Sequence, residues 1–185
     1  VVDDGSVDKT SQIASKMGAL VYRHVVNRGL GGALGTGMKA ALENKADIIV
    51  TIDSDGQHDV KDIKTALKPI FDKKADVVIG SRLMNPKGMP IIRRIGNWGF
   101  NIITYILFKV WTTDSQSGFR LFSKKAASKI KIKTNRMEVS SEIFNEIHRN
   151  KLKFAEVPIR VIYTEYSLEH GQSSLNGFKI LIKLL

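Results

Sequence analysis

The sequence contains no cysteine, no recognisable signal peptide and no long hydrophobic run. The absence of cysteine excludes a disulfide scaffold, a thiolate zinc site and a cysteine nucleophile, and it suits a reducing compartment. The best candidate for a membrane span, Ile95–Phe108, is shorter than the roughly 18 apolar residues that a span requires. We expect this segment either to lie on a bilayer surface or to form a core helix. The predicted location is therefore the cytoplasm or the cytoplasmic face of a membrane.

Acidic residues are in the minority, with 18 Asp and Glu against 29 Lys and Arg, which gives a formal net charge of +11. The basic residues are scattered among acidic ones, and their densest group lacks the interleaved aromatic residues that a single-strand stacking surface requires. We therefore predict no nucleic-acid partner. The charge indicates either a solvated basic face or a patch that meets anionic lipid or a phosphorylated substrate. The densest basic group is Lys124, Lys125, Lys129, Lys131 and Lys133.

The length of 185 residues and the ordinary content of 43% hydrophobic and 25% charged residues favour one globular domain over residues 1–185. The chain opens on Val1 and Val2, which read as the end of a strand already under way. We therefore expect the domain to be truncated at its N-terminus.

Strand-like and helix-like segments alternate along the first half of the chain. The β-branched run Ile48–Ile52 is typical of a buried strand, and Val77–Ile79 is a second such run. This alternation predicts an α/β fold with an open, mostly parallel sheet flanked by helices. In the second half we expect a short strand over 119–122, with Arg120 pointing outward. Helices are expected at 6–17, 32–44, 60–73, 90–111, 139–148 and 174–185, and the other strands at 1–2, 19–25, 47–53, 76–81 and 154–163.

Small, acidic and polar residues follow three of the predicted strands. In open α/β sheets, ligands bind outside the carboxyl ends of the strands. Each group alone is also explained as a turn or a helix cap, whereas three groups at successive strand ends indicate a binding site. The groups are Asp3-Asp4-Gly5-Ser6, Asp53-Ser54-Asp55-Gly56-Gln57 and Gly80-Ser81-Arg82.

Asp53 and Asp55 are the central candidates. Two carboxylates at a buried strand end repel each other, and burial disfavours their ionisation. A divalent cation removes both problems, and the hard oxygen ligands suit Mg²⁺ or Mn²⁺. The structural alternative is that Asp55 and Gly56 form a turn while Asp53 caps a helix.

The segment 27–37 is rich in glycine. It does not match the dinucleotide-binding fingerprint, because Leu34 stands at the third glycine position, and it does not match a phosphate-binding P-loop. Glycines let the backbone approach a ligand or a neighbouring helix closely, and a helix N-terminus here would favour phosphate. The alternative is a tight contact between helix and sheet.

Five motifs occur together in a fixed order, and this constellation resembles the family 2 glycosyltransferases of GT-A fold. Within that family it resembles the dolichyl- and polyprenyl-phosphate sugar transferases. The resemblance extends from Val1 to about Phe178. The motifs are Asp3-Asp4-Gly5-Ser6-x-Asp8-x-Thr10, Asn27-x-Gly29-x-Gly31-x-Ala33, Asp53-x-Asp55-x-Gln57, Gly80-Ser81-Arg82 and Ser117-Gly118-Phe119-Arg120.

The resemblance implies a role for each matching residue. Asp3 and Asp4 would contact the base and ribose of a nucleotide-sugar, and Asp53 and Asp55 would hold Mg²⁺ or Mn²⁺ and the donor diphosphate. Gln57 would act at the metal or the acceptor phosphate. Other expected nucleotide-sugar contacts are Asn27, Gly29 and Ser54, and the other expected catalytic residues are Arg82 and Arg120, facing phosphates, and Asp114.

The activity that the resemblance implies is inverting, metal-assisted transfer of a sugar from GDP-mannose or UDP-glucose to a polyprenyl phosphate. An ionised phosphate acceptor needs no general base, so the chemistry depends on positioning and charge stabilisation. The segment 90–111 would sit against the membrane surface that holds the acceptor. One alternative is a hydroxyl acceptor with Asp114 as the base, and another is a non-catalytic nucleotide-binding module.

Two features depart from the family pattern. The chain lacks the usual opening strand with its Pro-x-Tyr-Asn-Glu-like turn, so part of the nucleotide pocket is expected to be absent. Near the C-terminus the family often has Gly-x-Ser-Lys, whereas this chain has Gly171-Gln172-Ser173-Ser174.

Overall fold

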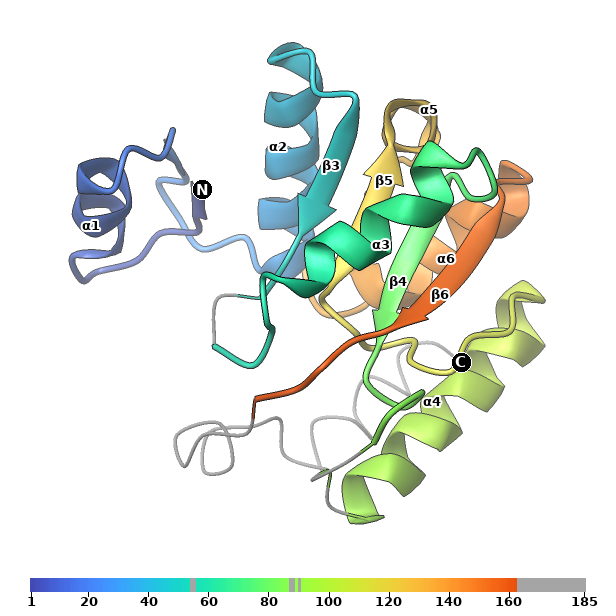
Figure 1. Ribbon diagram of the computed structural model, residues 1–185. Coiled ribbons are helices and arrows are strands. Elements are labelled where there is room, and N and C mark those ends of the chain that lie inside the picture. Colours follow the sequence, from blue (N-terminus) through green and yellow to red (C-terminus); the bar gives the residue numbers. More distant parts are fainter. Residues whose placement is uncertain (54–55, 87–88, 90, 163–185) are drawn as a thin grey trace.

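The computed structural model describes residues 1–53, 56–86, 89 and 91–162. Its strands form two separate sheets, and helices lie between them in sequence (Figure 1). The strands are β1 (Val2–Asp3), β2 (Tyr22–Arg23), β3 (Ile48–Thr51), β4 (Val77–Ser81), β5 (Arg120–Ser123) and β6 (Phe154–Pro158). The helices are α1 (Thr10–Lys16), α2 (Leu30–Glu43), α3 (Asp62–Phe71), α4 (Ile91–Phe108), α5 (Lys124–Lys129) and α6 (Val139–Arg149).

The larger sheet has the strand order β3-β5-β4-β6. Strand β5 runs antiparallel to both of its neighbours, while β4 and β6 are parallel. Strands β3, β4 and β6 therefore point the same way, and their carboxyl ends lie at one edge of the sheet. The prediction of a mostly parallel α/β sheet flanked by helices is confirmed, with β5 as the one opposed strand of this sheet in the described part of the chain.

Both faces of this sheet are covered. Helix α3 lies on one face, and α5 and α6 lie on the other (Figure 1). Because side chains alternate along a strand, Val78 packs toward Ala66 and Ile70 of α3, whereas Val77 packs toward Phe144 of α6. The two clusters bury the central strands β4 and β5 almost completely, which gives the polar residues at the strand ends a rigid support.

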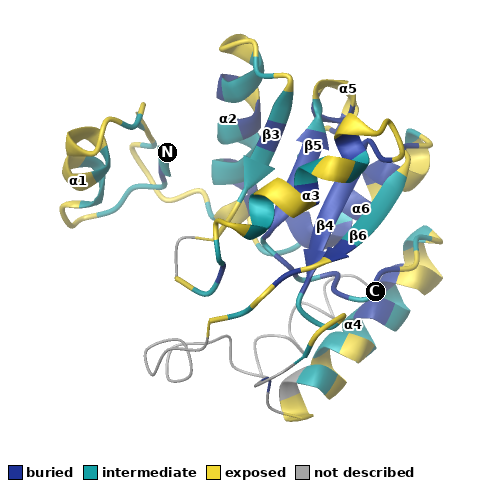
Figure 2. Ribbon diagram, in the orientation of Figure 1, coloured by how far each residue is buried: buried dark blue, intermediate teal, exposed yellow. Residues whose placement is uncertain are grey.

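Strands β1 and β2 pair in parallel in the second sheet, with α1 between them in sequence. Several apolar side chains of this part are exposed, among them Ile13 at 60% and Met17 at 82% (Figure 2). Within the described residues, no strand pairing joins β1 to β3. The expected N-terminal truncation of the domain stays a prediction.

The structure corrects several details. Helix α1 begins at Thr10 instead of Ser6, and the Asp8 carboxylate accepts the Thr10 N–H at 2.9 Å just before it. The prediction that Arg120 points outward is wrong, because β5 lies between two other strands and its Arg120 is only 3% exposed. The predicted helix over 174–185 lies outside the described residues.

Helix α4 buries polar side chains and exposes apolar ones. Its buried side chains include the polar Asn101 and Thr104, while Ile92, Ile95 and Trp98 are 71%, 66% and 61% exposed (Figure 2). Asn101 bonds the loop after the helix, donating to the Thr113 carbonyl at 2.6 Å. Among the described residues, no helix is long and apolar enough to cross a membrane.

Candidate active site at the carboxyl ends of the strands

Asp53 lies just beyond the carboxyl end of β3, and its carboxylate is about half exposed. The buried imidazole of His58 approaches it, with 3.9 Å between His58 Nε2 and Asp53 Oδ2. On another side the carboxylate packs against Gly118. A Cβ added at Gly118 would stand only 2.0 Å from Asp53 Oδ2, so this contact requires glycine.

The surroundings favour the ionised form of Asp53. Its pKa is lowered chiefly by the interaction with His58, and further by the positive charges of Arg120 and Arg82, against the opposing effect of burial. Asp53 is therefore a carboxylate at neutral pH. It is half exposed, so one or more of its oxygens can meet a ligand from solvent.

Arg120 supplies a fixed positive charge behind this carboxylate. Its side chain is buried and donates to the Ser117 carbonyl at 2.7 Å and to Ser140 Oγ at 2.9 Å. Burial lowers the pKa of Arg120 to about 10, although Asp53 and Asp114 act to raise it, so the guanidinium remains charged at neutral pH. Its bonds hold the group inside the protein, where it stabilises negative charge at the strand ends by proximity.

Arg82 follows β4 and forms a two-pronged ion pair with Asp114. Arg82 Nε lies 2.7 Å from Asp114 Oδ2, and Nη2 lies 2.8 Å from Oδ1. The backbone N–H of Arg82 donates to the same carboxylate at 2.9 Å, and Asp114 is fully buried. Both oxygens of Asp114 are thus engaged, and a role as general base would require breaking this pair.

Asp3 and Asp4 lie at the end of β1, and both accept hydrogen bonds from residues in the N-terminal part of the chain. Asp3 is buried and accepts from the backbone of Ser6 at 2.8 Å and from the hydroxyl of Ser11. These two bonds, the Ser11 bond first, lower the pKa of Asp3 to about 2.

The Asp4 carboxylate accepts from the backbone N–H groups of Arg28 and Gly29 at 2.9 and 2.6 Å, and it contacts His24 Nδ1 at 2.6 Å. Burial opposes ionisation, but these contacts prevail and lower the pKa of Asp4. Asn27 lies in the exposed segment before them, and its backbone passes close to Gly5.

The glycines at the start of α2 allow its backbone to lie close to the backbone of the loop at residues 134–135. Gly29 has a φ of 84°, and a Cβ at Gly31 would stand 2.0 Å from the Thr134 carbonyl oxygen. The N–H of Gly31 donates to the Asn135 carbonyl at 2.9 Å. The close approach that the glycines allow is thus to a loop at Thr134 and Asn135, and not to the neighbouring helix or the sheet that the sequence led us to expect.

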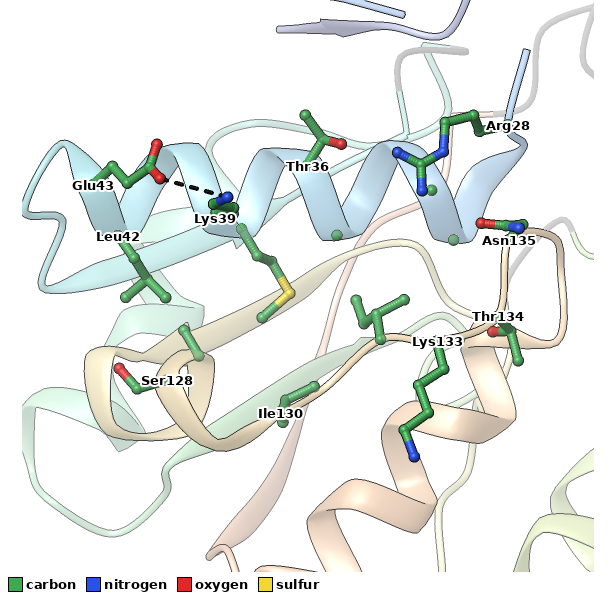
Figure 3. A pocket seen from close by; sticks show the side chains of 16 residues that line it. Arg28, Thr36, Lys39, Leu42, Glu43, Ser128, Ile130, Lys133, Thr134 and Asn135 are labelled. Atoms are coloured by element: carbon green, nitrogen blue, oxygen red, sulfur yellow. Dashed lines mark ion pairs between the residues drawn. The ribbon is translucent and has the colours of Figure 1, made fainter. Parts of the chain in front are cut away.

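An open groove of about 470 Å³ runs between α2, α5 and this loop (Figure 3). Its lining includes the basic residues Arg28, Lys39 and Lys133, and the glycines of α2 form part of its wall. In Figure 3 Lys39 points toward Glu43, and the two side chains lie 3.9 Å apart. The residues that line the groove do not include Asp53, so the groove is separate from the site at the end of β3.

The predicted site residues thus fall into two groups. Four of them lie at the strand ends of the larger sheet: Asp53 follows β3, Arg82 follows β4 and pairs with Asp114, and Arg120 begins β5. Gln57 is half-buried a few residues after Asp53, and its backbone carbonyl accepts the Ile162 N–H at 2.9 Å. Asp3, Asp4, Asn27 and Gly29 belong to the smaller sheet and the turn before α2.

Ser54 and Asp55 lie outside the described residues, so the expected pair of metal ligands is described only through Asp53. Among the described residues, no group of three His, Cys, Asp or Glu side chains is arranged to hold a metal ion. An ionised, half-exposed carboxylate nevertheless fits Mg²⁺ or Mn²⁺, which proteins often bind through one or two carboxylates together with substrate phosphates.

The sequence did not single out two contributors to this site. His58 belongs to none of the five motifs, and Gly118 stands out only as part of one of them. The signal for His58 was its position a few residues after Asp53. The contact of Gly118 with Asp53 spans 65 positions and has no local signature.

The arrangement is that of the GT-A fold: an α/β sheet with an aspartate, the buried Arg120 and the partly buried Arg82 at its strand ends. A model of the family described as "Glycosyl transferase family 2" matches residues 1–131. The chain therefore belongs to glycosyl transferase family 2, and it is a glycosyltransferase.

Among its relatives, an uncharacterised protein of Methanocaldococcus jannaschii is 54% identical over 190 residues, covering 100% of this chain and 78% of the relative. The UDP-N-acetylglucosamine–dolichyl-phosphate N-acetylglucosaminyltransferase of Methanococcus voltae is 40% identical, covering 100% and 82%. A crystal structure of Mycobacterium tuberculosis glucosyl-3-phosphoglycerate synthase, in complex with Mn²⁺, UDP-glucose and phosphoglyceric acid, has a TM-score of 0.65 at 19% identity, covering 100% of this chain and 67% of that one. The structural likeness confirms the expected fold.

Proposed function

We propose that this chain transfers a sugar, with inversion, from a uridine-diphosphate sugar to a polyprenyl phosphate, and that residues 1–185 form the catalytic domain. The single observation that carries the proposal is the ionised, half-exposed Asp53 at a strand end, backed by the buried Arg120. Membership of family 2 supports the reaction class. The names of the M. voltae relative and of the ligand in the M. tuberculosis structure favour a uridine nucleotide over GDP-mannose.

Asp53, with Asp55 as its expected partner, would hold Mg²⁺ or Mn²⁺ beside the donor diphosphate. The bound cation would stabilise the charge that develops on the leaving nucleoside diphosphate. The protein's own contribution is electrostatic: Arg120 is already buried in position, so its charge acts on the diphosphate without reorganisation. Gln57 and Arg82 remain candidates for contact with the phosphates, as the resemblance implies.

A phosphate acceptor fits this site better than a hydroxyl acceptor. A phosphate oxygen is already ionised near neutral pH and attacks without a base, whereas a hydroxyl needs a group to take its proton. The candidate base, Asp114, is fully buried and paired with Arg82 through both oxygens. The name of the M. voltae relative supports a polyprenyl phosphate as the particular acceptor.

We further propose that α4 rests on the membrane surface that holds this acceptor. The helix turns polar Asn101 and Thr104 inward and leaves Ile92, Ile95 and Trp98 exposed, the reverse of a helix that faces water. The net charge of +11 complements an anionic bilayer. Ile95→Glu should release the protein from anionic vesicles in sedimentation, whereas Ile13→Glu on α1, at a similar exposure of 60%, should not. Equal release by both changes would refute a role for α4.

The proposed reaction is tested by calorimetric titration of UDP-glucose, UDP-N-acetylglucosamine and GDP-mannose with and without Mn²⁺. We expect Mn²⁺-dependent binding of a uridine nucleotide, which Asp53→Asn abolishes and Asp72→Asn, at the exposed end of α3, leaves unchanged. Transfer to polyprenyl phosphate in vesicles is then measured with the donor that binds. Nucleotide binding that ignores Mn²⁺, with no turnover, would favour a binding module instead.

A further inference from the structure

His58 is held in a buried position next to Asp53 without an obvious structural reason for a polar side chain there. Its side chain is 3% exposed, and its ring meets Phe119 edge-on with 5.7 Å between ring centroids. The backbone is fixed by a bridge to Val161. An aromatic or aliphatic residue would fill this space without the cost of burying an imidazole.

The polar atoms of the imidazole point to one partner. Nδ1 is buried and has no hydrogen-bond partner in the described part of the chain, whereas Nε2 lies 3.9 Å from Asp53 Oδ2. Among the described residues, the ring therefore presents only Nε2 to a polar group, and that group is the Asp53 carboxylate.

Gly118 also packs against this carboxylate. Its missing side chain leaves the space that Asp53 occupies, since a Cβ there would overlap both carboxylate oxygens, at 2.0 and 2.3 Å. The carboxylate is thus confined between an imidazole and a backbone surface while it stays half exposed on its remaining side.

We propose that His58 is a positioning residue that holds the Asp53 carboxylate against Gly118, in the orientation in which it meets the divalent cation of the donor complex. This inference rests on the proposed function. It assigns to His58 the task that outer groups perform around many metal-binding carboxylates, which is to restrict a flexible ligand before the ion arrives. The contribution of His58 to the lowered pKa of Asp53 agrees with such a contact.

The experiment compares His58→Asn and His58→Gln. Both substitutions remove the ring and its contact with Phe119, but the amide nitrogen of glutamine reaches about as far as Nε2, whereas that of asparagine does not. Mn²⁺ binding in the presence of UDP is measured from the spin-resonance signal of free Mn²⁺, so the readout does not depend on turnover. Thermal unfolding verifies that both variants are folded, and His148→Asn on the exposed side of α6 is the control.

We expect His58→Asn to weaken Mn²⁺ binding by about 10- to 100-fold, while His58→Gln stays closer to the wild type. Equal affinities in the two variants would overturn the proposal, because loss of the ring alone would then explain the effect. Wild-type affinity in His58→Asn would overturn it as well. Failure of the wild-type protein to bind Mn²⁺ with UDP would overturn the proposed function, and the positioning role with it.

Gly118→Ala tests the other side of the carboxylate. The backbone of Gly118 lies outside the left-handed region, so alanine fits there except for its overlap with Asp53. We expect weaker Mn²⁺ binding, with no such change in Gly96→Ala, where a Cβ meets nothing within 4 Å. Unchanged affinity in Gly118→Ala would remove Gly118 from the proposal.

Discussion

The carboxylates near the strand ends fall into two groups that the sequence does not distinguish. Asp3, Asp4 and Asp114 are engaged by the fold, each accepting hydrogen bonds from backbone and side-chain donors of this chain. Asp53 is about half exposed and is approached by one imidazole and a glycine. The first group holds turns and loops in place, whereas Asp53 keeps charge available to a ligand. Motif membership alone therefore does not separate a carboxylate that the fold engages from one that stays exposed.

The strongest test of this comparison is Asp114→Ala. The Arg82 side chain, which is only 18% exposed, would lose both of its hydrogen bonds to the carboxylate, and the Arg82 backbone N–H would lose a third. Removing one partner of a buried pair typically costs about 3–5 kcal/mol, and we expect a loss of that size in the free energy of unfolding measured with urea. The double change Asp114→Leu with Arg82→Met should recover much of it. A loss in Asp114→Ala well below this range would return Asp114 to the list of candidate bases.

Asp4→Ala should have a smaller effect. It removes the acceptor for the backbone N–H groups of Arg28 and Gly29, which lead into α2. Loss of a comparable cap costs about 0.5–2 kcal/mol. Urea unfolding and faster amide exchange at Arg28 and Gly29 measure the change, and Asp4→Asn, which retains one acceptor oxygen, should lose less. Unchanged exchange in Asp4→Ala would show that Asp4 is free for a nucleotide.

The alternation of elements could be predicted because it has local causes. The runs Ile48–Ile52 and Val77–Ile79 are rich in β-branched residues; β3 lies within the first run, and β4 begins with the second and extends to Ser81. The burial of Arg120 could not be predicted, because a residue pattern of period two does not reveal that both faces of β5 are covered.

The motifs of the candidate site could be predicted from the sequence, but the contacts between their residues could not. Arg82 and Asp114 are 32 positions apart, and Asp4 and Gly29 are 25 apart. Such pairings arise when the sheet assembles, and a single sequence carries no local trace of them. The same holds for Gly31, whose small size suits the backbone at Thr134.

A further prediction concerns the stability of the fold at low pH, to which the Asp3 carboxylate contributes. Because its hydrogen bonds lower the pKa of Asp3 to about 2 from 3.8, its contribution to stability is full above about pH 4 and is lost as the pH falls toward 2. We expect the thermal midpoint of the wild-type protein to fall over this interval. Asp3→Asn should be less stable at neutral pH and should show a shallower fall. Parallel curves for the two proteins would show that the Ser6 and Ser11 bonds do not depend on the charge.

The smallest expected effect on the unliganded fold is that of Asp53→Asn. The lowered pKa of Asp53 means that its charge stabilises the fold near neutral pH, but the half-exposed carboxylate is screened by solvent, which limits the loss to about 0.2–1 kcal/mol. The wild type and Asp53→Asn should differ clearly once Mn²⁺ and UDP are added. A ligand at 100 times its dissociation constant stabilises a protein by about 2.7 kcal/mol, and we expect a corresponding rise in the thermal midpoint of the wild type but not of the variant. A variant that lost as much stability as Asp114→Ala, or that kept the ligand-dependent rise, would place Asp53 with the structural carboxylates, and the division between the two groups would fail.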